Sequence, residues 1–157
     1  MWWGEREEEK NHVQPTLCRC TNTLMLLFYT GDKSAAMNAV ASLAAGDPTE
    51  DGHIATTAAG GRMLKTLVAG GHYNSKLKKV ETITPPLGFH EVLYDSIVDN
   101  VAAWAAGAGS FVVLSLLETD GFTRVTKLKA QLRKCKKDIT AAAKAGNKGS
   151  AAVDKKL

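Results

Sequence analysis

Cysteine is scarce in this sequence, and the three that occur lack the spacing of a disulfide framework or a metal site. Cys18 and Cys20 lie too close together for an easy bridge, and Cys135 falls on the apolar stripe of an expected helix. A structural zinc ion needs four ligands, and Cys18, Cys20 and His12 supply fewer. The composition therefore favours a reducing compartment and predicts that the chain has neither a structural disulfide nor a bound metal.

Long apolar runs are also lacking. The longest strongly apolar run in the early part of the chain is 24–29, whereas a membrane helix needs about 20 such residues. The first ten residues are mainly acidic, where a secretory signal would be basic. We therefore expect neither a secretory signal nor contact with a membrane.

No pattern in the sequence predicts an active site. An enzyme would need a nucleophile beside a base, or paired carboxylates in a cleft. Asp95 and Asp99 are one turn apart, but on the exposed face of an amphipathic helix. Gly107 and Gly109 follow no strand and lack the third glycine of a dinucleotide site, and 146–150 lacks the frame of a phosphate-binding loop. We expect a non-enzymatic protein that needs no cofactor.

Positive charge, in contrast, is concentrated at one end of the chain. Residues 121–157 contain 11 Lys and Arg against 2 Asp and Glu, a net charge of +9, whereas residues 1–120 carry a net −5. Such a block attracts phosphate and other anionic surfaces. The alternative is a solvated helix face that has no partner.

Helical periodicity dominates residues 31–157. We expect helices at about 33–45, 58–69, 91–105, 110–118, 124–137 and 139–145, and a last one over 150–157. Segment 110–118 is apolar on nearly all sides, so it should be a middle helix packed from two directions. The sequence also allows a short strand pair around 80–83. Residues 1–30 show no stable periodicity, and we expect them to be poorly ordered.

Two of the expected helices look like copies of one unit. Segments 60–68 and 109–118 each start at glycine, pass a small residue and then a planar or cationic one, and continue with apolar residues. A recurring helix of this kind indicates a solenoid, in which units that cannot bury themselves alone stack on their neighbours. The predicted fold class is therefore an all-α helical-repeat solenoid with two to three repeats.

Residues 31–157 carry five motifs that together are typical of one family. They are Gly46-Asp47-Pro48 with Asp51-Gly52-His53-Ile54, Gly60-Gly61-Arg62-Met63-Leu64-Lys65-Thr66-Leu67, Pro85-Pro86-Leu87-Gly88-Phe89-His90, Gly109-Ser110-Phe111-Val112-Val113 and Gly146-Asn147-Lys148-Gly149. This stretch resembles the C-terminal, CPL-type region of nucleolar pumilio-like proteins, the Puf-A or Penguin branch of the PUF family. Residues 1–30 show no such resemblance, so the chain looks like the tail of a longer repeat protein.

The resemblance implies a pumilio-type solenoid located in the nucleus and nucleolus. It also implies RNA binding, with ribosomal or messenger RNA as partner, and a role in large-subunit ribosome biogenesis or translational regulation. Pre-ribosomal proteins are further implied partners. The alternative function is a protein–protein interaction module of a nucleolar assembly that makes no direct RNA contact.

Pumilio repeats that read a sequence place three side chains of one helix on each base. The matching positions here are Gly61, Arg62 and Lys65 in the first copy and Ser110, Phe111 and Leu114 in the second. Gly61 has no side chain and Leu114 cannot form a hydrogen bond with a base, whereas Arg62 and Phe111 could stack on any base. We therefore predict RNA binding that is led by the backbone and has little sequence specificity.

The candidate RNA-binding residues lie on two helices, one loop and the basic C-terminal region. They are Arg62, Lys65, Lys76, Lys78, Lys79, Ser110, Phe111, Lys127, Lys129, Arg133, Lys134 and Lys137. Several have a structural alternative: Arg62 would bond to neighbouring carboxylates, Phe111 would belong to the core, and the lysines of residues 76–79 would form a solvated loop.

Overall fold

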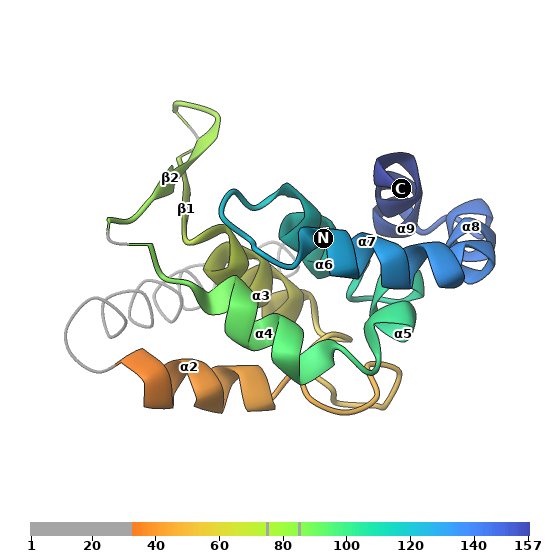
Figure 1. Ribbon diagram of the computed structural model, residues 1–157, viewed down its shortest axis with the longest axis horizontal. Coiled ribbons are helices and arrows are strands. Elements are labelled where there is room, and N and C mark those ends of the chain that lie inside the picture. Colours follow the sequence, from red (N-terminus) through yellow and green to blue (C-terminus); the bar gives the residue numbers. More distant parts are fainter. Residues whose placement is uncertain (1–32, 75, 85) are drawn as a thin grey trace, which may run out of the picture.

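The computed structural model describes residues 33–74, 76–84 and 86–157. In these residues the chain forms eight helices and one two-stranded sheet (Figure 1), so the expected all-α class is confirmed. The helices are α2 (Lys33–Ser42), α3 (Ala58–Ala69), α4 (Phe89–Ile97), α5 (Val101–Ala106), α6 (Ser110–Glu118), α7 (Val125–Lys134), α8 (Lys136–Lys144) and α9 (Lys148–Lys156). Within these ranges, every helix is too short or too polar to span a bilayer.

Helix α6 is the centre of the packing. It contacts α3 on one side and α9 on the other, and α5 and α7 also pack against it. Val112, Val113 and Leu116 are fully or almost fully buried by these neighbours. The predicted middle helix that is packed from two directions is therefore confirmed.

The single helix expected over 91–105 is wrong, because this segment forms two helices. Helix α4 ends at Ile97 and α5 begins at Val101. Between them, the side-chain amide of Asn100 donates a hydrogen bond to the carbonyl of Gly46 at 2.7 Å. The break allows α4 to pack on α2 and α3, while α5 packs on α6, α7, α8 and α9.

Local signals explain where α3 begins and ends. Thr57 caps its start, because its hydroxyl accepts a hydrogen bond from the backbone N–H of Gly60 at 3.0 Å. Gly70 ends it in the left-handed conformation, with φ of +65°. Before the helix, the ring of His53 meets that of the buried Trp104 edge-on, with centroids 5.6 Å apart. The loop before α3 is thereby joined to α5.

The short strand pair that the sequence allows is present as an antiparallel hairpin. Strand β1 (Gly71–Asn74) pairs with β2 (Lys79–Thr82), so that Gly71 lies opposite Thr82. Glycine is required at position 71, since a Cβ atom there would lie 2.0 Å from the carbonyl oxygen of Glu81. The hairpin projects from the helical body beside α3 and α4 (Figure 1).

Two of the sequence motifs, 109–113 and 146–149, meet where α9 packs on α6. The Oδ1 atom of Asn147 caps α9 by accepting from the N–H of Ser150 at 3.1 Å, and it also accepts from the Ser110 hydroxyl at 3.0 Å. Its side-chain amide donates to the carbonyl of Gly107 at 2.9 Å. A Cβ atom at Gly149 would lie 2.2 Å from the Ser110 hydroxyl. Both motifs therefore have a role in packing.

Candidate nucleic-acid interface

A hollow of about 410 Å³ lies between the N-terminal parts of α3 and α6. It brings together three of the twelve candidate residues, Arg62, Lys65 and Phe111. The rest of its lining comes from small and hydroxyl-bearing residues at the same helix ends: Ala55, Thr56, Thr57, Ala58, Gly61, Ala108 and Val112. The hollow therefore combines one aromatic ring, two cations and two hydroxyl groups.

Phe111 is a surface residue, so the alternative that placed it in the core is wrong. Its side chain is 46% exposed, and the Lys65 ammonium lies 5.9 Å from the centre of its ring. A cation over an aromatic face at an exposed site contributes about 0.5–1 kcal/mol. An exposed ring beside a cation can also receive a nucleic-acid base by stacking.

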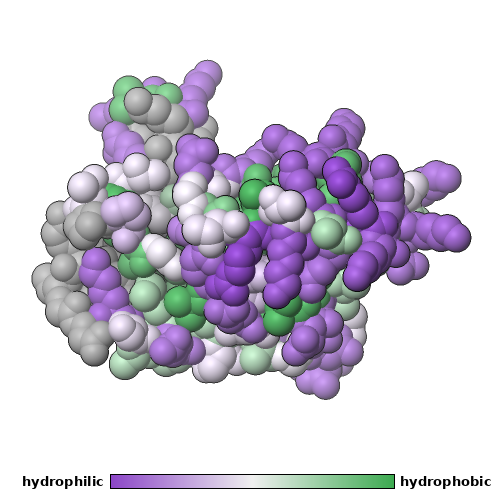
Figure 2. Space-filling view, viewed as in Figure 1, coloured by the Kyte–Doolittle hydropathy of each residue, from purple (hydrophilic) through white to green (hydrophobic). Residues whose placement is uncertain are grey.

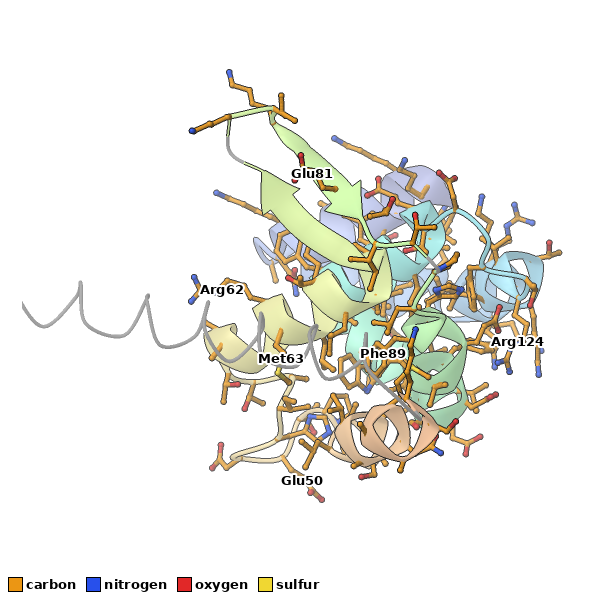
Figure 3. The ribbon with its side chains drawn as sticks, turned by 90° about the vertical axis from the view of Figure 1, so that its left-hand side faces the viewer. Glu50, Arg62, Met63, Glu81, Phe89 and Arg124 are labelled. Carbon is orange, nitrogen blue, oxygen red and sulfur yellow. The ribbon has the colours of Figure 1, made fainter. Side chains whose placement is uncertain are left out.

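Arg62 lies in the first half of α3, well apart from the buried Phe89 (Figure 3). Its Nε–H donates to the carbonyl of Ala58 in its own helix at 3.1 Å. The bonding of Arg62 to a neighbouring carboxylate, which was the alternative for this residue, is not seen among the described residues. Arg62 is an exposed residue.

Ser110 does not line the hollow, although it occupies a position that the resemblance assigns to base contact. Its side chain is 1% exposed and bonds to Asn147. The small size of Ser110 could have indicated this burial from the sequence, because a small side chain allows α9 to approach α6 closely. The structure thus separates Ser110 from its neighbour Phe111, which points outward.

The candidate lysines of residues 76–79 lie on the hairpin. Lys76 and Lys78 are exposed in the turn between the strands, and Lys79 begins β2 opposite Asn74. A paired backbone flanks the turn, and the alternative of a solvated loop for these lysines is not contradicted by their exposure. The hairpin places this positive charge on an arm, apart from the helices that bear the other candidates.

The basic residues of α7 do not form one face. Leu128 and Leu132 are buried, which leaves a broad outer side. Lys127 and Lys134, seven residues apart, share one edge of it, and Lys129 and Arg133, four apart, share the other. Three of these residues of α7 are exposed, namely Lys127, Arg133 and Lys134, while Lys129 is half-buried. Lys137, which belongs to α8, is also exposed. Hydrophilic side chains dominate the visible surface of α7, α8 and α9 (Figure 2).

The sequence-based set missed further cations on this surface. Nine of the eleven Lys and Arg residues in 121–157 are exposed. In the described part of the chain, Lys136 pairs with Asp154 at 3.9 Å and Lys156 with Glu118 at 3.0 Å. Arg133 bonds to the backbone oxygen of Leu157 at 3.2 Å. The charge count alone could have indicated the additional exposed lysines, which are Lys144, Lys148 and Lys155.

Arg124 is occupied by a separate structural network. Its Nε–H donates to Glu91 of α4 at 2.7 Å, its other end forms an ion pair with Asp95, and its guanidinium lies 5.1 Å from the centre of the Tyr94 ring. The N–H and hydroxyl of Thr123 also donate to Glu91. This network fixes the start of α7 on α4 and explains why Arg124 and Asp95 are not available as site residues.

The network predicts a specific dependence of stability on pH. Burial alone would raise the pKa of Glu91, but bonds from Thr123 and Arg124 outweigh burial and lower it below 4.5. The bond from Arg124 lowers the pKa of Asp95 below 3.8. Both carboxylates therefore favour the folded state at neutral pH, and this contribution is lost as pH falls through their lowered pKa values.

Replacing Arg124 with glutamine is expected to lower the melting temperature most at neutral pH. The difference from the wild-type protein should shrink as pH falls through the lowered pKa values of Glu91 and Asp95, because protonated carboxyl groups no longer form ion pairs with Arg124. Thermal unfolding followed by circular dichroism over a pH series measures this difference. A difference that stays constant down to the acid limit would contradict the electrostatic role of the network.

Comparison with known proteins places these features in a family. A family model described as the CPL (NUC119) domain matches residues 14–78. The chain is 31% identical over 114 residues to Pumilio homology domain family member 6 of Schizosaccharomyces pombe, a match that covers 73% of this chain and 18% of that protein. It is 38% identical over 90 residues to the Saccharomyces cerevisiae protein of the same name, covering 53% and 14%.

The fold is thus that of an all-α protein whose C-terminal surface is cationic. The matches support a pumilio-like protein with a CPL region, as the motifs indicated. The chain spans less than a fifth of the length of these two relatives. The family match starts at residue 14, inside the segment 1–30 that we expected to lie outside the family. The order of residues 1–30 lies outside the described residues and stays a prediction.

Proposed function

We propose that this chain binds RNA through lysine contacts with the phosphate backbone, with little sequence specificity. The observation that carries the proposal is the exposure of nine of the eleven cations in 121–157. Phosphate contacts from lysine supply affinity that does not depend on base sequence. From the family resemblance we further propose that this binding occurs in the nucleus and nucleolus. Its proposed role is large-subunit ribosome biogenesis or translational regulation, with ribosomal or messenger RNA as partner and without catalysis.

The hollow between α3 and α6 supports a second kind of contact. Phe111 and Arg62 offer a ring and a guanidinium plane, on which an unpaired base can stack whatever its identity. Gly61 has no side chain and Leu114 is apolar, so the pumilio-type positions supply few groups that could read a base edge. This composition favours stacking on bases over recognition of a base sequence. For the fold, we propose that the helices form two to three repeats of the pumilio type.

The direct test is fluorescence anisotropy of the full chain with labelled RNAs of unrelated sequence, single- and double-stranded, across a salt series. The test variant replaces four lysines that form no ion pair within 4.0 Å among the described residues: Lys127→Ser, Lys129→Ser, Lys134→Ser and Lys137→Ser. Arg133 is kept, because its bonds to Leu157 hold the end of α9. We expect binding to weaken about tenfold or more and the salt slope to fall by about 3.

A control variant gives the same change of net charge on another surface. It replaces four exposed residues of α2: Ala35→Glu, Asn38→Glu, Ala39→Glu and Ser42→Glu. If both variants weaken binding equally, total charge rather than the C-terminal surface controls affinity. If the wild-type chain binds no RNA at low salt, the RNA proposal is wrong, and interaction with acidic protein segments takes its place.

A further inference from the structure

The turn of the β-hairpin presents an apolar side chain between two cations. Leu77 is 56% exposed, one of the few large apolar side chains that the described structure places in solvent. Lys76 and Lys78 flank it, and both are exposed. Lys78 has a φ of +51°, the left-handed conformation that residues other than glycine adopt at a cost of about 1 kcal/mol. The turn thus exposes an apolar group in a strained backbone.

The base of the hairpin is held firmly to the helices. Gly71 is buried and follows α3 almost directly, and the N–H of Ile83 donates to the carbonyl of Gly70 at 3.0 Å. Strand β1 packs against α3, whereas the turn extends beyond the helical body in both views (Figures 1 and 3). The hairpin is therefore an arm with a fixed base and an outer end bearing Lys76, Leu77 and Lys78.

The chemistry of this end favours nucleic acid over a protein partner. The centre of a protein interface is depleted in lysine and is built around aromatic or arginine anchors, and leucine is under-represented among its energetic centres. An exposed apolar residue with flanking cations is instead typical of proteins that insert a wedge at a base step while lysines contact phosphates.

We propose that the β1–β2 hairpin is an RNA-binding arm that places Leu77 against an unstacked base step in an interrupted RNA duplex. Lys76 and Lys78 contact the phosphates on either side. The favoured target is a duplex with a bulged nucleotide. Separating stacked bases costs a few kcal/mol, and less energy is needed at a bulge because the bases there are already less well stacked. This inference rests on the proposed RNA-binding function and gives it a preferred RNA structure.

The test uses the full chain and a short RNA duplex with one bulged nucleotide beside 2-aminopurine, whose emission rises when it unstacks. An end label reports binding in the same sample by anisotropy, and a fully paired duplex is the control RNA. The wild-type chain should raise 2-aminopurine emission in the bulged duplex. Leu77→Ser should lose this rise while its affinity for the paired duplex changes less than about twofold, as for other exposed positions.

Two further variants define the parts of the arm. Leu43→Ser removes a comparably exposed leucine, 58% exposed, beyond the end of α2, and should behave as wild type. Lys76→Ser with Lys78→Asn removes both charges, and asparagine tolerates the left-handed conformation at position 78. This double variant should weaken binding to the bulged duplex and lower its salt slope by about 2.

The outcomes separate the arm from the general function. Binding by the wild-type chain with an emission rise that survives Leu77→Ser would overturn the arm and leave the RNA proposal intact. The double lysine variant could also bind RNA as the wild-type chain does and lose binding to a labelled polyglutamate. That result would mean that the hairpin binds an acidic protein segment rather than RNA. Absence of any anisotropy change with the wild-type chain would overturn both proposals.

Discussion

Replacing Gly60 with alanine is expected to lower the free energy of unfolding by about 2–3 kcal/mol, near the upper end for overpacking a filled site. A Cβ atom at this position would lie 2.3 Å from the carbonyl oxygen of Ile54 and 2.4 Å from its side chain. The closest atom belongs to the backbone, so the clash cannot be relieved by a change of rotamer. The loop that carries His53 onto Trp104 would have to move away from α3.

The neighbouring glycine provides a matched control in the same helix. A Cβ atom at Gly61 would meet nothing within 4 Å, and its backbone is helical. Gly61→Ala should therefore raise the free energy of unfolding by about 0.5–1 kcal/mol, because alanine loses less backbone entropy than glycine on folding. Urea unfolding followed by circular dichroism measures both variants, and equal effects of the two substitutions would contradict the packing of α3 described above.

Replacing Asn147 with alanine should lower the free energy of unfolding by about 3 kcal/mol. Loss of the α9 cap accounts for about 1 kcal/mol. The buried Ser110 hydroxyl and the carbonyl of Ala106 also lose a partner, while the carbonyl of Gly107 keeps only its 3.3 Å bond from the backbone N–H of Ser110. An unsatisfied buried polar group costs about 1–3 kcal/mol. The same urea experiment measures this loss.

Asn147→Asp separates the two roles of this side chain. Aspartate keeps the oxygen that accepts from Ser150 and Ser110, but it cannot donate to the carbonyls of Ala106 and Gly107. The free energy of unfolding of Asn147→Asp should lie between that of the wild-type protein and that of Asn147→Ala. If aspartate is as harmful as alanine, the amide donor alone holds the junction, and capping of α9 contributes little.

The sequence predicted helices well where glycines or caps mark their ends. The expected ranges 58–69 and 110–118 agree with α3 and α6, because Gly70 and the Gly107–Gly109 region interrupt the apolar pattern. The break between α4 and α5 was missed, since no glycine or proline lies there. It is stabilised by the bond from Asn100 to Gly46, 54 residues away, which local patterns cannot reveal.

Prediction of the site depended on which side of a helix each residue faces. Helix α6 is apolar nearly all round, so its sequence could not show that Phe111 is exposed while its neighbour Ser110 is buried. The partner that buries Ser110 is Asn147, in a motif near the other end of the chain. Charge was easier to predict, because lysines on an amphipathic helix remain exposed whatever the helix packs against.

The central position of α6 has a consequence for how the chain folds. The segments before and after Val98–Asn100 meet where α3 packs on α6 and where Glu91 binds Arg124. Each segment thus buries apolar surface of the other segment. We therefore expect the described residues to unfold cooperatively, because neither segment can bury its apolar surface without the other.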